Sequence, residues 1–427
     1  MNISKWYNFG IKIYPICRSI TGDGIKKTLK LIQNKIKGFK IVTVKSGKKV
    51  YDWTVPQEWN ISEAYIEDEK RKKIIEFKNN NLHIINYSIP VNRILSKKKL
   101  LTKLHFLKKK PNAIPYITSY YKKNWGYCCT YNQFKEIKKK YGNKSKFKVV
   151  INSSLKSGFL NYGELVIAGK TKEEILISTY ICHPSMANNE LSGPLVSLML
   201  AEHFQKQKKL EKTLRFIFVP ETIGSIVFLH RNLKYIKKNV IGGYNLSCIG
   251  DERNHSCMLT KYKNKISDSA LLEAYRKLKI KPKIYSFLHR GSDERQYNSP
   301  GIDLPIASIF RTKYGEYPEY HTSLDDFNLV TKKGLAGGFQ VAKTAIEILL
   351  KKIIPKNNIL CEPNMGRRGL YPMLSVGKLN TETKDLINFL TFADGTNDLE
   401  KIAIHIKKSY TKTKDIFNLL KKKKLIV

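Results

Sequence analysis

Short apolar runs alternate with longer amphipathic stretches over the middle of the chain. β-Branched residues dominate the runs, whereas the longer stretches repeat apolar residues every three or four positions, as one face of a helix does. Expected strands begin at Ile175 and span 214–219, 240–249 and 304–310, and expected helices span 195–204 and 334–351. Because strands that alternate with helices pair in parallel, we expect an α/β fold with a mixed, mostly parallel sheet flanked by helices.

A helical pattern also covers residues 3–36, interrupted by a polar break at 14–24. The break could face a substrate, or it could simply connect two helices with Thr21 and Asp23 as caps. The main domain is then expected to comprise residues 1–40 and 152–355.

Between residues 41 and 151 the pattern changes to short β-like runs separated by turns and prolines, which predicts a β-rich inserted subdomain. The expected strands are 41–44, 50–55, 74–77, 82–87 and 147–151. The segment is rich in aromatic residues, including Trp53, Trp59 and Trp125. Exposed aromatic rings could stack on a sugar or a peptide, whereas buried ones would form core.

Residues 363–427 read as a separate winged-helix domain. A linker with a turn at 363–377 precedes three amphipathic patterns and a short terminal strand. The patterns span 381–392, 399–407 and 413–422, and the strand spans 425–427. The last helix carries lysines but no Arg, which favours a protein-contact or oligomerisation role over sequence-specific DNA reading. We expect a homo-oligomer.

Charge and cysteine content narrow the class of protein further. The formal net charge is +43, but only 12 of the 78 basic residues are Arg and the lysines are dispersed, so nucleic-acid binding stays possible without being favoured. No apolar run approaches the roughly 20 residues that span a bilayer, and the first residues lack a signal-peptide core. The seven cysteines include no CxxC pair, which argues against a disulfide framework. We therefore expect a cytoplasmic protein with no membrane span.

Chemistry-bearing side chains follow successive expected strands. His183 follows the first strand, Glu221 the second and Asp251 the third, and His321 lies in a later aromatic segment. In an open α/β sheet the carboxyl ends of the strands border one crevice, where ligands and catalytic groups gather. The Asp325-Asp326 pair has the alternative interpretation of a helix N-terminal cap.

With those positions assembled, the chain resembles the co-catalytic zinc aminopeptidases of the glutamate carboxypeptidase superfamily. It looks closest to a bacterial branch with a β-rich insertion and a C-terminal winged helix. The carrying segments are CHPSMANNELSGP (182–194), PETIGS (220–225), GDER (250–253), RGSDERQYNSPGIDLP (290–305) and EYPEYHTSLDD (316–326), with ITGDG (20–24) and YDWTVPQEWN (51–60) typical of the branch.

The resemblance implies a role for each matching residue. His183, Asp251 and His321 fall where metal ligands belong, Glu190 neighbours the position of the bridging carboxylate, and Glu221 falls at the general base. Asn189 replaces the bridging Asp, and Thr222 replaces a second Glu. An amide oxygen is a poorer zinc ligand than a carboxylate, so one Zn²⁺ is expected more than two.

The polar loop at 290–295 is expected to complete the site. By the resemblance Asp293 supports a metal-binding His, so we expect it within hydrogen-bonding reach of His183 or His321, or one residue removed. Arg290, Arg295 and Tyr320 are the expected substrate-binding residues.

These observations predict a zinc-dependent, aminopeptidase-like hydrolase that acts on an amide or peptide bond in a small-molecule or peptide substrate. The branch is associated with surface-polysaccharide biosynthesis, so the substrate could be an amide-bearing sugar. Two alternatives stay open: a catalytically degenerate binding or assembly protein on the same scaffold, and a winged-helix DNA-binding regulator.

Overall fold

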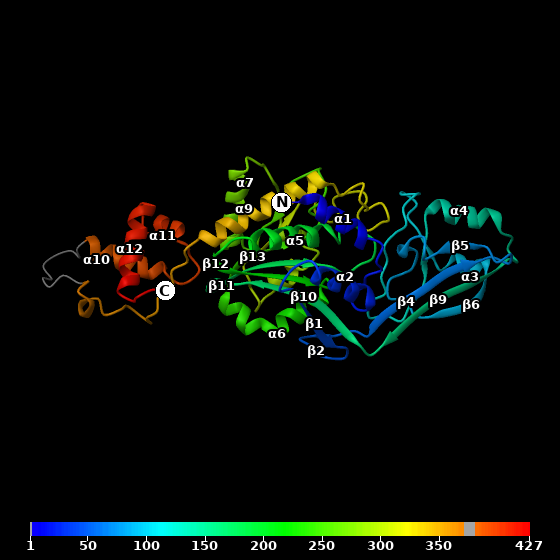
Figure 1. Ribbon diagram of the computed structural model, residues 1–427, viewed down its shortest axis with the longest axis horizontal. Helices are drawn as coiled ribbons and strands as arrows, with labels where there is room; N and C mark the ends of the chain where they lie inside the picture. The colour runs from blue at the N-terminus through cyan, green and yellow to red at the C-terminus, as the bar shows by residue number, and fades with distance from the viewer. Residues whose placement is uncertain (1, 371–380) are drawn as a thin grey trace.

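The computed structural model describes residues 2–370 and 381–427. Figure 1 shows an elongated molecule with a central domain, the insertion at one end and the C-terminal helices at the other. No helix in these two ranges is both long enough and apolar enough to cross a bilayer.

An eight-stranded sheet forms the centre of the molecule, in the order β1-β10-β12-β11-β13-β16-β14-β15. The strands are β1 (Lys40–Lys45), β10 (Phe159–Ile167), β11 (Gly169–Tyr180), β12 (Leu210–Val219), β13 (Val240–Leu246), β14 (Ser256–Met258), β15 (Lys283–Tyr285) and β16 (Ile306–Phe310). The four central strands, β12, β11, β13 and β16, pair in parallel, and β1, β10 and β14 add antiparallel pairs. The expected fold class is confirmed.

Helices cover both faces of the sheet. α1 (Ile3–Ile13), α2 (Asp23–Gln33), α5 (Ser192–Gln205), α7 (Ile266–Lys277) and α9 (Lys332–Lys351) share one large core cluster, and α6 (Ile223–Asn239) packs in the cluster of the other face. The central strands are buried on both sides, which is why their sequences read as nearly continuous apolar runs.

The insertion is a second, four-stranded antiparallel sheet in the order β5-β4-β9-β6. It comprises β4 (Glu58–Glu67), β5 (Lys73–Glu76), β6 (Val91–Ser96) and β9 (Lys146–Lys156), with α3 (Lys97–Leu101) and α4 (Tyr131–Lys140). β4 and β9 run as a long ribbon out of the central domain (Figure 1). The insertion was predicted to begin at residue 41. Residues 41–45 instead belong to β1, which pairs with β10 in the main sheet.

Two expected strands were wrong. Residues 82–87 form a 3₁₀ turn (Asn81–His83) and a buried loop, because the Asn80 side chain accepts the Leu82 amide and starts the turn. The single strand expected at 50–55 is instead a hairpin of β2 (Lys49–Val50) and β3 (Trp53–Thr54). The apolar residues of 82–87 are buried, and a short apolar run does not reveal which backbone form achieves that.

The C-terminal domain contains α10 (Thr381–Phe392), α11 (Leu399–His405) and α12 (Tyr410–Lys422) around its own apolar core. The expected terminal strand is reduced to an isolated bridge between Asn357 and Ile426. Lys352, at the end of α9, pairs with buried Asp398 at 3.1 Å and joins the two domains. Part of the linker expected at 363–377 lies outside the described residues.

Candidate functional site

The carboxyl ends of β11, β12 and β13 lie side by side, because these strands are parallel neighbours or next neighbours in the sheet. The loops that follow them carry His183, Glu221 and Asp251. The structure therefore brings the three predicted strand-end motifs to the same edge of the sheet.

His183 lies at the centre of the site, 5% exposed and with a positive φ of 73°. Its Nε2 atom is 3.6 Å from Glu221 Oε2, and its Nδ1 atom contacts the Glu190 carboxylate and lies 3.0 Å from Cys182 Sγ. One potential ligand atom from each of Cys182, His183 and Glu190 lies within 4.8 Å of the others. A left-handed backbone at a residue with a Cβ is costly, and such strain gathers at functional sites.

Burial sets the protonation states in this cluster. It lowers the pKa of His183 to about 4, so the imidazole is neutral near pH 7, as a metal ligand must be. Burial also raises the pKa of Glu221 to about 7, opposed by His183, which suits a general base. The pKa of the Glu190 carboxyl is raised well above its ordinary value by burial, and the Arg18 guanidinium opposes that effect.

Arg18 is a member of the site that the sequence argument did not assign. Its side chain is fully buried in the break between α1 and α2, and Nη1 donates to the Ile13 carbonyl at 2.7 Å. Arg18 Nε and Nη2 and Glu190 Oε2 have no hydrogen-bond partner among the described residues. The signal available in the sequence was an Arg inside a polar break that could face a substrate.

Asp251 and His321 do not join the cluster of three. Asp251 accepts hydrogen bonds from the Thr312 amide and hydroxyl at 2.9 and 2.6 Å, and from Asn188 Nδ2 at 3.2 Å. The His321 ring lies 6.4 Å from the His183 ring, centroid to centroid, and burial lowers its pKa to about 3. Asp251 thus ties the loop after β13 to Thr312 and Asn188, and His321 stays apart from the cluster.

Asn189 and Asp325 shape the loop around His183. Asn189 Oδ1 accepts the Tyr180 hydroxyl at 2.8 Å, so this amide oxygen is already engaged. Asp325 accepts the backbone amides of Asn188 and Asn189 at 2.6 and 3.0 Å. The helix-cap interpretation of the Asp325-Asp326 pair is wrong, because Thr331 caps α9.

Tyr116 from the insertion covers the two histidines. Its ring lies edge-on to His183 and to His321, with centroids 5.0 and 5.1 Å apart, and its amide donates to the His321 carbonyl at 2.9 Å. The Tyr320 ring stacks on the His321 ring, with the two ring centroids 3.9 Å apart. The insertion thus contributes directly to the site, which its sequence gave no means to anticipate.

The loop at 290–295 reaches Glu221 and Thr222. Ser292 Oγ donates to Glu221 Oε1 at 2.7 Å, and Arg295 Nη2 donates to Thr222 Oγ1 at 2.9 Å. Arg290 differs: it is exposed, and its guanidinium lies over the Phe287 ring, 5.3 Å from the centroid.

Asp293 supports the turn after β12. Its Oδ1 atom accepts the Thr222 amide and the Ser225 hydroxyl, both at 2.7 Å, and Oδ2 has no hydrogen-bond partner in the described chain. Asp293 therefore makes no direct bond to either histidine. It holds the residue that follows Glu221, and Glu221 faces His183.

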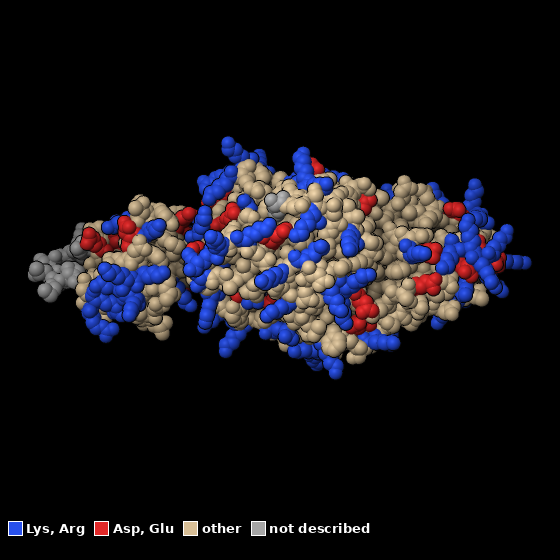
Figure 2. Space-filling model, in the orientation of Figure 1, with Lys and Arg blue, Asp and Glu red and all other residues tan. Residues whose placement is uncertain are grey.

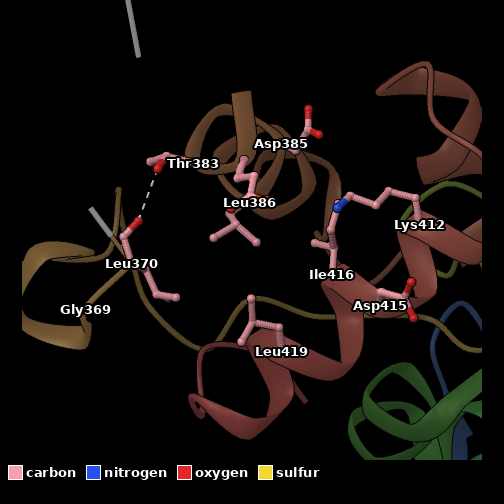
Figure 3. Close-up of a pocket in the computed structure, with 10 residues that line it drawn as sticks. Gly369, Leu370, Thr383, Asp385, Leu386, Lys412, Asp415, Ile416 and Leu419 are labelled. Atoms are coloured by element: carbon pink, nitrogen blue, oxygen red, sulfur yellow. Dashed lines mark hydrogen bonds between the residues drawn. The ribbon is translucent and has the colours of Figure 1, made fainter. Parts of the chain in front are cut away.

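A separate pocket lies between α10 and α12 (Figure 3). Leu370, Leu386, Ile416 and Leu419 provide its apolar lining, and Lys412 and Asp415 lie beside them. Lys and Arg side chains are scattered over the whole face in Figure 2, in keeping with the dispersed lysines of the sequence.

Comparison with known proteins identifies the family. A model described as a domain of unknown function, DUF4910, matches residues 7–352. The chain belongs to this family. A winged helix-turn-helix model matches residues 353–427, after the DUF4910 domain.

The DUF4910 chain has relatives along its full length. A Clostridium acetobutylicum protein, provisionally named a polysaccharide biosynthesis protein with an aminopeptidase-like domain, is 40% identical over 402 residues, which cover 93% of this chain and 90% of that protein. A crystal structure of a provisionally named peptidase from the same organism aligns with a TM-score of 0.80 and 38% identity, over 100% of this chain and 96% of that one.

More distant structures show the fold type. A zinc aminopeptidase from Bacillus subtilis aligns with a TM-score of 0.57 and 14% identity, over 81% of this chain and 94% of that one. A peptidase M28 precursor from Shewanella amazonensis aligns with a TM-score of 0.56 and 11% identity, over 81% and 93%. The aminopeptidase-like fold and the C-terminal winged helix expected from the resemblance are confirmed.

Proposed function

We propose that this protein is a zinc-dependent hydrolase of amide bonds. The observation that carries the proposal is the contact between His183 and Glu221, 3.6 Å apart, beside the Cys182 and Glu190 donors. A neutral imidazole and a carboxylate whose pKa is about 7 are the groups that metal-assisted hydrolysis needs in one place.

The donor set fits one zinc ion better than two. His183 and Glu190 would hold it, and Cys182 is the third donor in the present geometry. Asp251 and His321, the other expected ligands, would have to turn inward, and Asp251 would give up bonds to Thr312 to do so. When bound, zinc supplies a Lewis acid and lowers the pKa of a water molecule.

The remaining chemistry falls to Glu221 and its neighbours. Glu221 Oε1 is held by Ser292, which leaves Oε2 directed towards His183 and able to take a proton from water. The same carboxyl then returns the proton to the leaving amine. Tyr116 keeps bulk solvent from the histidines, and Arg295 lies within reach of a substrate near Thr222.

The substrate we infer is an amide-bearing sugar or a sugar–amino-acid conjugate. The name of the Clostridium relative, which refers to polysaccharide biosynthesis, supports a sugar component, and the aminopeptidase-like fold supports an amide or peptide bond. We place the protein in the cytoplasm, as a homo-oligomer whose winged helix contacts protein more than DNA.

Metal analysis and hydrolysis assays test the proposal together. Purified protein should contain about one zinc per chain, and it should release amine from aminoacyl amides or N-acyl amino sugars. Glu221→Gln should retain the metal and abolish hydrolysis. Absence of zinc, with no change on His183→Ala, would overturn the metal assignment.

A second candidate function is ligand binding without turnover. The observation that favours it is the hydrogen bond from Tyr180 to Asn189, which occupies the amide where a bridging carboxylate would stand. Asn189→Asp combined with Thr222→Glu should create hydrolysis if only the second metal position is missing. Wild-type hydrolysis would rule this candidate out.

A further inference from the structure

A groove of about 400 Å³ lies outside the catalytic cluster, against α6. One wall is the hairpin of β2 (Lys49–Val50) and β3 (Trp53–Thr54), and the floor consists of Ile226, Leu229 and Leu233 from α6. Gln296 and residues 299–302 form the other wall. This volume is in the range of small-ligand sites.

The hairpin presents two large aromatic side chains to this groove. Tyr51 is 52% exposed and Trp53 is 38% exposed. The Tyr51 ring packs edge-on against His230, and the Trp53 ring packs edge-on against Tyr121. Each ring is therefore held in place by a neighbour while part of its surface stays open to solvent.

Polar groups accompany the two rings. Asp52, Gln296 and Ser299 line the same groove, and they provide a carboxylate, an amide and a hydroxyl. A sugar ring has an apolar face of C–H groups, which stacks on an aromatic ring, and hydroxyl groups around its edge, which pair with such polar side chains. The combination fits a carbohydrate better than a peptide main chain, which would need a row of backbone partners.

The groove is connected to the catalytic site by two short segments. Gln296 follows Arg295, which bonds Thr222, and Ile226 lies four residues after Thr222 on α6. Four helical residues span about 6 Å along the axis, about one sugar ring. The groove thus begins about one helical turn of α6 from Thr222, the residue that follows Glu221.

We propose that this groove, with Tyr51, Trp53 and Gln296, is a carbohydrate-binding subsite for the glycan part of the substrate. The inference rests on the proposed function, since it names the substrate class of the proposed hydrolysis. The subsite gives a role to residues 51–53, which take no part in the proposed hydrolysis.

Binding without turnover tests this subsite. The probes are N,N′-diacetylchitobiose, which is neutral, and a hyaluronan tetrasaccharide, which carries carboxylates. Each is titrated by saturation-transfer NMR into full-length Glu221→Gln protein treated with EDTA. At least one probe should bind, and Trp53→Ala should weaken it about tenfold. Gln296→Ala should also weaken it, while Tyr262→Ala, at an aromatic residue 70% exposed and outside the groove, should leave it unchanged.

The outcomes separate this inference from the proposed function. Binding of neither probe, or equal binding by folded Trp53→Ala protein, overturns the subsite. Displacement of the sugar by trileucine would identify a peptide groove and also overturn it. If Trp53-dependent binding holds while amide hydrolysis is absent, only the proposed function falls; if hydrolysis holds without sugar binding, only the subsite falls.

Discussion

Asp325 Oδ2 accepts the backbone amide of Asn189 at 3.0 Å, across 136 residues of sequence. The same carboxylate accepts the Asn188 amide through its other oxygen. The loop that carries Glu190 is thus fixed by a segment that also carries His321. This arrangement makes the site depend on one buried carboxylate that does not itself need to touch metal or substrate.

Replacement of Asp325 should therefore loosen the site. Asp325→Asn places an NH₂ group against amide donors and should lower the free energy of unfolding by about 2 to 3 kcal/mol, with weaker zinc retention. Thermal unfolding and metal analysis measure the two effects. Asp326→Asn is the matched control, because the Asp326 side chain bonds only the nearby Asn328 among the described residues. Equal effects of the two variants would contradict the role of Asp325.

Tyr116 should matter through its ring more than through its hydroxyl. Tyr116→Ala removes the contact with His183 and His321 and admits water, so kcat should fall by ~10-fold or more. Tyr116→Phe loses only the hydrogen bond to Tyr120 and should stay within about threefold of wild type. Steady-state kinetics compare them, and a similar loss in both variants would point to the hydroxyl instead.

The pH dependence of hydrolysis should report Glu221. A general base must be unprotonated, and burial raises the Glu221 pKa to about 7, so kcat/KM should rise through pH 7 and level off above it. Ser292→Ala removes a hydrogen bond that stabilises the charged carboxylate, so the rising limb of the pH profile of kcat/KM should move to higher pH. A rising limb that stays near pH 4 to 5 would contradict the raised pKa of Glu221.

Asp293 should make stability depend on pH. Burial raises its pKa to about 7, above its value in the unfolded chain, so its contribution is full below about pH 4 and is lost as pH rises through 7. Asp293→Asn cannot ionise and keeps an acceptor for Thr222 and Ser225. Between pH 5 and 8 the variant should gain about 2 to 3 kcal/mol relative to wild type in urea unfolding. Parallel curves for the two proteins would contradict this.

The sequence by itself determined the strands that are buried on both faces and the helices that bury one regular stripe of side chains. The central strands and the helices of 334–351 and 381–392 followed from local patterns, because burial on two faces or along one stripe leaves a direct trace in residue order. The strand-end positions of His183 and Glu221 also followed, since parallel strands must end at one edge of the sheet.

Only the tertiary structure decided how that edge is completed. Arg18 enters from the N-terminal break, Tyr116 from the insertion, and Asp325 turns to the loop before α5 instead of capping α9. Residue order does not show these contacts, because the partners are far apart in the chain and meet only when distant segments pack together. The orientation of Asp251 towards Thr312 was likewise set by competing hydrogen bonds that residue order does not encode.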